Sequence, residues 1–297
     1  MLLFDEFIPY YNRGGVNRLA HLNNKAYILR VYRHQWRKLH EINFEIDILN
    51  HLKNKGLHVS YPIQKTNMEY LTELNAPEGL RYTLLTTCAL GKEPTYRNID
   101  DASSYGMHVA KLHNYSENFT SNFTKQNLDM SYLLYNSIKT INTFMKSYPK
   151  HKKYFQNFIE KLLSKIKYLP MENLNYGFCH GDLYGGNAHK HLDNIEFFDF
   201  DFCGFGWRSY DISVFRWGCR SRNQEDKLWN AYIDGYKSIR KISDLDLEWT
   251  TYFLIIRDLW AMALYIKNSK EFGSVWLGDF YIEKRMKFLK KFEEDYL

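Results

Sequence analysis

The chain has 297 residues, which is enough for one large domain or two smaller ones. Its composition, 45% hydrophobic, 17% aromatic and 25% charged, is that of a globular protein and excludes a disordered one. Forty basic residues against 34 acidic ones give a formal charge of +6. These charges are scattered without a basic block, so an anionic ligand is compatible with the sequence, whereas binding to nucleic acid is not indicated.

Two features bear on the compartment. The cysteines show neither CxxC pairing nor His-rich metal spacing, which favours reduced thiols in the cytoplasm; they are Cys88, Cys179, Cys203 and Cys219. The first 15 residues lack the basic start and long apolar core of a signal peptide. The most apolar segment, residues 249–266, carries Arg257 and Asp258 at its centre, where a bilayer would penalise both. We therefore expect a buried helix there and no membrane association.

The first predicted elements are a strand and a helix. Residues 26–33 alternate, so that Ile28, Arg30 and Tyr32 share one face of the strand. Residues 36–53 follow with helical periodicity and an apolar stripe that consists of Leu39, Ile42, Ile46, Leu49 and Leu52. Glu45 falls inside this stripe, and an acid facing a core needs a cation opposite it. Arg30 is the nearest candidate in sequence; the alternative is that Glu45 reaches solvent at the edge of the stripe.

A change of pattern after residue 87 indicates two lobes. Residues 61–64 and 81–87 are predicted strands, with residues 75–80 as the turn between them. Residues 101–116, 132–146 and 153–169 are all periodic and are predicted helices. A sheet-rich first part and a helix-rich remainder predict an α+β fold with an N-lobe of residues 1–87 and a C-lobe of residues 88–297.

The segment 178–207 crowds acids into apolar surroundings. Asp182 and Asn187 lie in a glycine-containing loop, and Asp199 and Asp201 follow on an alternating strand that puts Ile195, Phe197 and Asp199 on one side. Hairpin-like proximity would bring Asp182, Asn187 and Asp199 around one point. Carboxylate and amide oxygens suit a hard cation such as Mg²⁺, which takes few protein ligands and is completed by substrate phosphates. This set is typical of phosphoryl transfer.

The same residues carry a resemblance to a known family. The pattern HGDLxxxN at residues 180–187, then FFDFD and the later Asp211, resembles the aminoglycoside phosphotransferase and choline kinase family, which has the protein-kinase-like fold. Within it, the chain looks most like the branch of homoserine-kinase-like and stress-response kinases. The stretches YILRVYR, FEIDILNHL, LLTTCALG and GMHVAKLHN match the family's phosphate-contacting strand, paired-Glu helix, hinge and first large-lobe helix.

The resemblance assigns roles in the chemistry. Asp182 would orient the acceptor hydroxyl and accept its proton. Asn187 and Asp199 would hold Mg²⁺, and Asp201 would touch a second metal ion. Asp211 would brace the loop around His180 through backbone hydrogen bonds.

Nucleotide binding is implied in the same way, with ATP or GTP as the donor. Arg30 would contact the α- and β-phosphates and be held by Glu45. It stands where protein kinases carry Lys, so a planar fork replaces a point charge. The remaining implied nucleotide contacts are Gly14, Gly15, Thr87 and Ala89. The two glycines are equally typical of an ordinary turn.

Several other features favour structural interpretations. His189 and His191 lack a third metal ligand at sensible spacing, and Cys179 beside His180 does not suit a nucleophile–base pair. The basic stretch 284–292 is typical of the solvent face of a helix. Arg257 and Asp258 are candidates for acceptor contacts, and a structural ion pair is the alternative.

The acceptor is the open question. Residues 225–297 balance acidic and basic side chains, which does not indicate a polycationic acceptor. We expect a kinase that phosphorylates a hydroxyl of a small molecule, either an antibiotic or a metabolite. The alternatives are a Ser/Thr protein kinase of the stress-response type and a nucleotide-binding pseudokinase, against which intact Asp182, Asn187 and Asp199 argue. The oligomeric state is not predicted.

Overall fold

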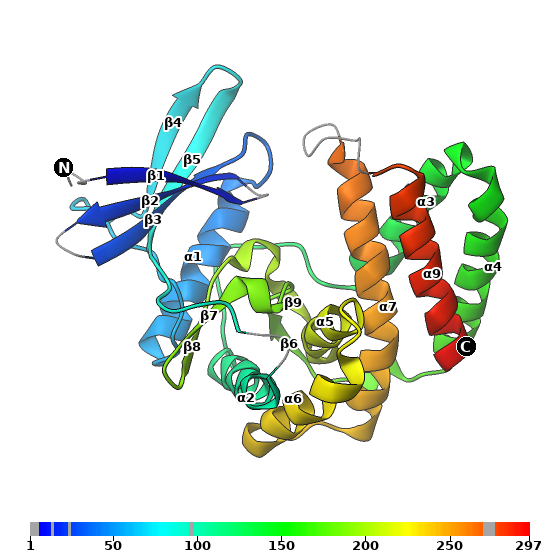
Figure 1. Ribbon diagram of the computed structural model, residues 1–297. Coiled ribbons are helices and arrows are strands. Elements are labelled where there is room, and N and C mark those ends of the chain that lie inside the picture. The colour runs from blue at the N-terminus through cyan, green and yellow to red at the C-terminus, as the bar shows by residue number, and fades with distance from the viewer. Residues whose placement is uncertain (1–5, 13–14, 23–24, 95–97, 270–276) are drawn as a thin grey trace.

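The computed structural model describes residues 6–12, 15–22, 25–94, 98–269 and 277–297. The chain forms two lobes that lie side by side (Figure 1). The first contains a five-stranded antiparallel sheet, in the order β1-β2-β3-β5-β4, with one helix, α1, packed beside it. The second is mainly helical and contains two short two-stranded sheets.

The strand β3 is the centre of the large sheet. Its neighbours are β2 (Gly15–Leu22) and β5 (Gly79–Thr87), and β1 (Glu6–Asn12) pairs with β2 at one edge. β3 spans Lys25–Tyr32, which confirms the predicted strand to within a residue. Arg30 lies opposite Leu84 of β5 and is buried together with Tyr32. The alternation of the sequence therefore places Arg30 on the face that α1 covers.

The helix α1 spans Leu39–Asn54, a few residues later than predicted. Its first turn is capped because the Glu41 carboxylate accepts a hydrogen bond from the Lys38 amide at 2.9 Å. The apolar stripe is buried apart from Leu39, which is 42% exposed. Glu45 is buried with the stripe, so the alternative in which it reaches solvent is wrong.

One predicted strand is wrong. Residues 61–64 make only an isolated bridge, between Pro62 and Thr86, and the partner of β5 is instead β4 (Leu71–Ala76). Two backbone hydrogen bonds flank this bridge, from the Ile63 amide to the Leu85 carbonyl oxygen and from the Thr87 amide to the Tyr61 carbonyl oxygen, and the bridge remains isolated beyond them. β4 is a largely exposed edge strand without apolar alternation, so periodicity could not reveal it. The predicted turn does lie between two strands, because Ala76 pairs with Gly79.

The helices of the second lobe begin with α2 and end with α9. Their bounds are α2 Ile99–Tyr115, α3 Asn136–Phe144, α4 Pro149–Ile166, α5 Arg208–Arg220, α6 Glu225–Ile239, α7 Asp244–Lys267 and α9 Asp279–Tyr296. The predicted helix at 132–146 is divided: a π-helical turn at Ser131–Tyr135 precedes α3 and a 3₁₀ turn at Met145–Ser147 follows it.

Two apolar clusters hold the helices together. One joins α3, α4, α7 and α9, which lie together on the side of the molecule away from the large sheet (Figure 1). The other joins α2 and α6 to Phe44, Ile48 and Leu49 of α1, so the core of the second lobe extends onto the helix of the first. The segment that carries Arg257 is buried over most of its length in α7. No helix in the described part of the chain has the length and apolar character needed to cross a membrane.

Four short strands bracket the acidic segment. β6 (Tyr176–Cys179) pairs with β9 (Gly204–Trp207), and β7 (Ala188–His191) pairs with β8 (Asn194–Phe197). The β7–β8 hairpin extends toward α1 and α2 (Figure 1). The loop from β6 to β7 and the turn from β8 to β9 thus meet between the two lobes.

Candidate active site

One buried carboxylate accepts hydrogen bonds from the backbone of the loop after β6. Asp211 of α5 is fully buried and accepts hydrogen bonds from the amides of His180, at 2.6 Å, and Gly181, at 2.7 Å. Gly181 has φ of +82°, and a side chain there would meet the Phe202 carbonyl oxygen, so glycine is required. The imidazole of His113, 3.2 Å away, also contacts Asp211. These contacts place Asp182 at the tip of the loop.

Asp182, Asn187 and Asp199 come together as expected from hairpin-like proximity. The Asn187 side-chain amide donates to the Asp182 carboxylate at 3.0 Å and to its carbonyl oxygen at 2.9 Å. The Phe198 amide donates to the Asn187 carbonyl oxygen at 3.1 Å, which brings the residue before Asp199 beside the loop. The prediction that the strand runs through Asp199 is wrong. β8 ends at Phe197, and Asp199 adopts a left-handed backbone with φ of 61°.

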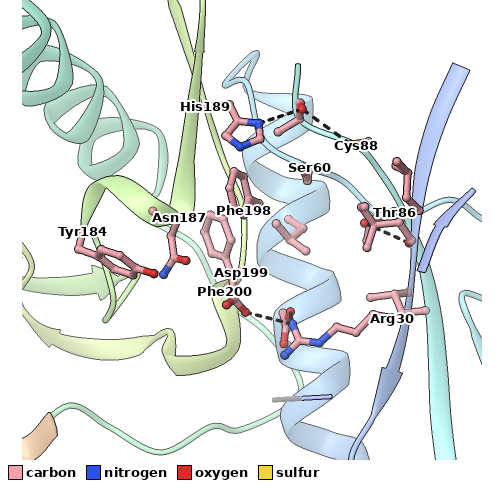
Figure 2. Close-up of a pocket in the computed structure, with 17 residues that line it drawn as sticks. Arg30, Ser60, Thr86, Cys88, Tyr184, Asn187, His189, Phe198, Asp199 and Phe200 are labelled. Carbon is pink, nitrogen blue, oxygen red and sulfur yellow. Dashed lines mark hydrogen bonds and ion pairs between the residues drawn. The ribbon is translucent and has the colours of Figure 1, made fainter. Parts of the chain in front are cut away.

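Arg30 faces this group from the sheet of the other lobe (Figure 2). Its Nη1 lies 3.2 Å from Glu45 Oε1 and 3.4 Å from Asp199 Oδ1. Burial by itself would lower the pKa of the Arg30 guanidinium, but the surrounding Tyr32, Asp201, Glu45 and Asp199 raise that pKa well above its ordinary value. The cation therefore stays charged and links α1 to the acidic turn.

The Asp201 carboxylate is bound by two arginines and a tryptophan. Arg30 Nη2 lies 2.9 Å from its Oδ1, Arg37 approaches both carboxylate oxygens at 3.2 Å, and Trp36 Nε1 donates to Oδ2 at 2.7 Å. Burial alone would raise the pKa of Asp201, but Arg37 and Arg30 outweigh it and hold that pKa far below its ordinary value. Both oxygens are thus engaged by protein donors, which disfavours the expected contact with a second metal ion. Sequence periodicity did not single out Trp36 or Arg37, which lie in the β3–α1 loop.

Arg257 and Asp258 are both buried but have different partners. Arg257 forms an ion pair with Asp182, donates to the Gly181 carbonyl oxygen at 3.2 Å and approaches the Tyr210 hydroxyl at 3.4 Å. Asp258 points elsewhere and accepts from Trp217 Nε1 at 2.9 Å and Arg285 Nη1 at 2.5 Å. The two residues are therefore not paired with each other.

A cavity of about 300 Å³ opens between the lobes beside these groups (Figure 2). It is lined by residues from both lobes, including Arg30, Glu45, Ser60, Thr86, Cys88, Ala89, Tyr184, Asn187, His189 and Asp199. Thr87, an expected nucleotide contact, does not line this cavity. Its hydroxyl instead accepts a hydrogen bond from the Tyr61 amide at 3.1 Å. Gly15 begins β2, whereas Gly14 lies outside the described residues.

His189 is a lining residue that sequence reasoning missed, having considered it only as a metal ligand. Its Nδ1 lies 3.1 Å from the Ala89 carbonyl oxygen, and its ring packs edge-on against Phe198. Within the residues that the structure describes, no cluster of three His, Cys, Asp or Glu side chains suits a metal ion. Burial raises the pKa of the Cys179 thiol well above its ordinary value, which is consistent with an inert structural cysteine.

The donor set fits a hard divalent cation. Asn187 and Asp199 present an amide and a carboxylate oxygen at the same end of the cavity, and both line it. Two protein oxygens leave room for phosphate oxygens and water, which is the usual coordination of Mg²⁺ in phosphoryl-transfer sites. Soft or nitrogen-rich ligation, typical of transition metals, is not offered by this pair.

Comparison with known proteins identifies the family. A model of the phosphotransferase enzyme family matches residues 13–242, so the chain belongs to that family. A relative from Deinococcus radiodurans, called an uncharacterized protein, is 31% identical and covers 95% of this chain and 84% of its own length. Amicoumacin kinase of Bacillus subtilis is 26% identical over 65% of this chain and 56% of that protein.

A solved structure shares the fold. Amicoumacin kinase hAmiN in complex with AMP-PNP, Ca²⁺ and Ami superposes with a TM-score of 0.78 at 18% identity, covering 98% of this chain and 88% of that one. The resemblance to aminoglycoside phosphotransferases and choline kinases and the predicted bilobal, protein-kinase-like α+β fold are therefore confirmed. The chain is a kinase-like phosphotransferase of this family.

Proposed function

We propose that the chain transfers the γ-phosphoryl group of ATP or GTP to a hydroxyl of a small molecule. The observation that carries this proposal is the position of Asp182 beside Asn187, at the edge of the cavity that Arg30 and Asp199 line. In the reaction, the acceptor oxygen forms a bond to the γ-phosphorus as the bond to the β-phosphate oxygen breaks. The hydroxyl proton passes to the Asp182 carboxylate and then to solvent, and a nucleoside diphosphate leaves.

The side chains divide the work. Arg30, held by Glu45, would contact the α- and β-phosphates, and the hinge around Cys88 and Ala89 would face the base. Asn187 and Asp199 would hold Mg²⁺, which when bound neutralises phosphate charge. Asp211 keeps the loop in shape from below. The proposed boundary between the nucleotide-binding lobe and the catalytic lobe stays at residues 87 and 88.

A small-molecule acceptor is supported by the relatives, since amicoumacin kinase is named for one. Asp258 is a weaker candidate than Arg257 for an acceptor contact, because its Oδ1 already accepts from Trp217 and Arg285 and it does not contact the loop of Asp182. Dependence on a cellular nucleotide and four unpaired cysteines support a cytoplasmic location.

The decisive variant is Asp182→Asn, which keeps the size of the side chain but removes the base. We expect kcat to fall by roughly 10²–10⁴, the usual effect of losing a general base. Nucleotide affinity should be unchanged, whereas stability should fall because the buried Arg257 loses its charged partner, so kcat is compared at a temperature where both proteins are folded. The measurement is nucleotide consumption with pooled hydroxylated metabolites and antibiotics as acceptors.

A parallel assay tests the other acceptor class: the wild-type protein is incubated with the nucleotide and a pool of purified proteins in place of the small molecules. Transfer to protein but to none of the small molecules would contradict the small-molecule assignment and favour a protein kinase. Turnover of an identified acceptor by Asp182→Asn at the wild-type rate would rule out Asp182 as the base.

A further inference from the structure

We infer that Arg257 is a positioning residue for the Asp182 carboxylate, an inference that rests on the proposed function. Its guanidinium extends from α7 to the loop of residues 180–187, called the catalytic loop below. Arg257 and Asp182 are 75 residues apart in sequence. The guanidinium contacts Asp182 at one carboxylate oxygen, while the Asn187 amide donates to the other. The carboxylate is therefore held between two donors on opposite oxygens, and rotation about its Cβ–Cγ bond would break both contacts.

Arg257 is itself fixed on all sides. The Gly181 carbonyl oxygen and the Tyr210 hydroxyl accept from its Nη1, at 3.2 and 3.4 Å. Its guanidinium carbon lies 4.6 Å from the ring centre of Trp260 and 5.2 Å from that of Trp217. A side chain confined by two indoles, a backbone oxygen and a phenol has one orientation to offer Asp182. The catalytic loop thus receives a rigid cation.

Stability does not explain this arrangement. Arg257 is only 5% exposed, and its Nε is buried without a hydrogen-bond partner in the described part of the chain. Burying a cation carries a large desolvation cost, and an apolar residue of similar volume often serves stability equally well. An unsatisfied buried donor adds to that cost. A buried cation that directs its Nη2 donor at the proposed base therefore indicates a role in catalysis.

The proposed reaction indicates what Arg257 does for Asp182. The carboxylate oxygen that takes the acceptor proton must point at the hydroxyl during transfer, and a carboxylate free to rotate would often point elsewhere. Arg257 can hold it because the guanidinium stays charged: burial would lower its pKa, but Asp182 and Tyr210 raise that pKa above its ordinary value. The titratable or charged groups described around Asp182 are Arg257, Tyr210 and His180, and Arg257 is the cation among them with a direct ion pair.

The test compares Arg257→Met and Arg257→Lys with a matched control, Arg285→Met. Arg285 is likewise a largely buried arginine, with 13% of its side chain exposed, but its acidic partner is Asp258 of α7 and not the catalytic loop. Phosphate release from Mg·ATP, with water as the acceptor, supplies a rate without knowledge of the natural acceptor. Nucleotide affinity is measured by calorimetry, and stability by urea denaturation.

For Arg257→Met we expect kcat to fall about 10²-fold, the size typical of a misplaced catalytic group, with nucleotide affinity unchanged. KM for Mg·ATP should stay unchanged as well, so that the loss lies in kcat alone. Arg257→Lys keeps the charge but not the fork, so it should recover part of the lost kcat. Arg285→Met should lose stability without a change in kcat.

Two results would overturn the inference. If Arg257→Met keeps kcat within about twofold of wild type, Arg257 is a structural residue only. If the wild-type protein releases no phosphate from Mg·ATP and phosphorylates no acceptor, the proposed function fails and this inference fails with it. The first result leaves the proposed function intact, so the two failures are distinguishable.

Discussion

At the scale of single residues, the acids of the segment 182–211 have different partners. Asp182 contacts Asn187 and Arg257, Asp199 lines the cavity, Asp201 is enclosed by Arg30, Arg37 and Trp36, and Asp211 accepts from the amides of the loop after β6. Their residue type is the same, and only their partners separate them. A carboxylate with both oxygens taken by protein donors has little capacity left for a metal ion or substrate.

Asp211→Ala tests the supporting role. The substitution removes the acceptor for two buried amides, at His180 and Gly181, and each unsatisfied donor costs about 1–3 kcal/mol. We therefore expect the free energy of unfolding, measured by urea denaturation, to fall by about 2–6 kcal/mol. Asp226→Ala, at an exposed position in the first turn of α6, is the control. A loss no larger than that of the control would contradict the bracing role of Asp211.

At the scale of elements, α2 carries two buried histidines. His113 contacts Asp211 and Tyr236, and His108 lies 2.8 Å from the Ser104 carbonyl oxygen. Burial lowers the pKa of both imidazoles below the ordinary value of 6.5 and outweighs the opposing hydrogen bonds. The helix whose His113 contacts Asp211 therefore buries two neutral imidazoles.

The lowered pKa values of His108 and His113 predict how the stability of the fold depends on pH. In the unfolded chain both histidines take up protons near pH 6.5, whereas in the folded chain they do so only at lower pH. Their contribution to stability is thus complete above pH 6.5 and is lost as the pH falls through the folded pKa values. We expect the free energy of unfolding to decrease below this point, by at most about 1.4 kcal/mol per pH unit for each histidine.

Urea denaturation over a pH series checks this prediction. His113→Gln should lower stability at neutral pH and also flatten the decline in acid. The exposed His191 of β7 offers a matched control, since His191→Gln should leave the slope unchanged. A wild-type stability that stays constant, or rises, as the pH falls below 6.5 would show that the buried imidazoles do not govern the response.

At the scale of the whole molecule, the proposed nucleotide site lies between the two lobes. Arg30 and Glu45 come from one lobe, and Asn187 and Asp199 from the other, and all four line the same cavity. The apolar cluster that includes Phe44 and Ile48 already couples α1 to the second lobe. A ligand that bridges both sides should therefore stabilise the molecule as one unit.

Mg²⁺ dependence is the corresponding prediction. With Mg·ATP or Mg·GTP at 100 times its Kd, the free energy of unfolding should rise by about 2.7 kcal/mol. Removal of the metal with a chelator should weaken nucleotide binding, because Asn187 and Asp199 then lose the cation that joins them to the phosphates. Calorimetry with and without Mg²⁺ measures the difference, and Asp199→Asn should reduce it. Equal affinity under both conditions would contradict the proposed metal site.

The pairing of Arg30 with Glu45 and that of Asp182 with Asn187 can be predicted from the sequence, because both follow from local sequence patterns. The alternation in β3 and the periodicity in α1 place Arg30 and Glu45 on facing surfaces, and the structure has them 3.2 Å apart. The loop and hairpin of residues 180–199 bring Asp182 and Asn187 together within a few residues of chain. Local patterns suffice here because backbone geometry fixes where neighbouring side chains point.

The remaining contacts were decided only by tertiary structure. Arg257 meets Asp182 across 75 residues, and Arg37 meets Asp201 across 164. Neither pair leaves a periodic signal, since a buried ion pair is defined by how α5, α7 and the β3–α1 loop pack and not by spacing along the chain. β4 was missed for the same reason: an exposed edge strand is selected by the backbone hydrogen bonds that β5 offers it. Local sequence therefore determines which groups are available, and the packing of distant elements decides which of them meet.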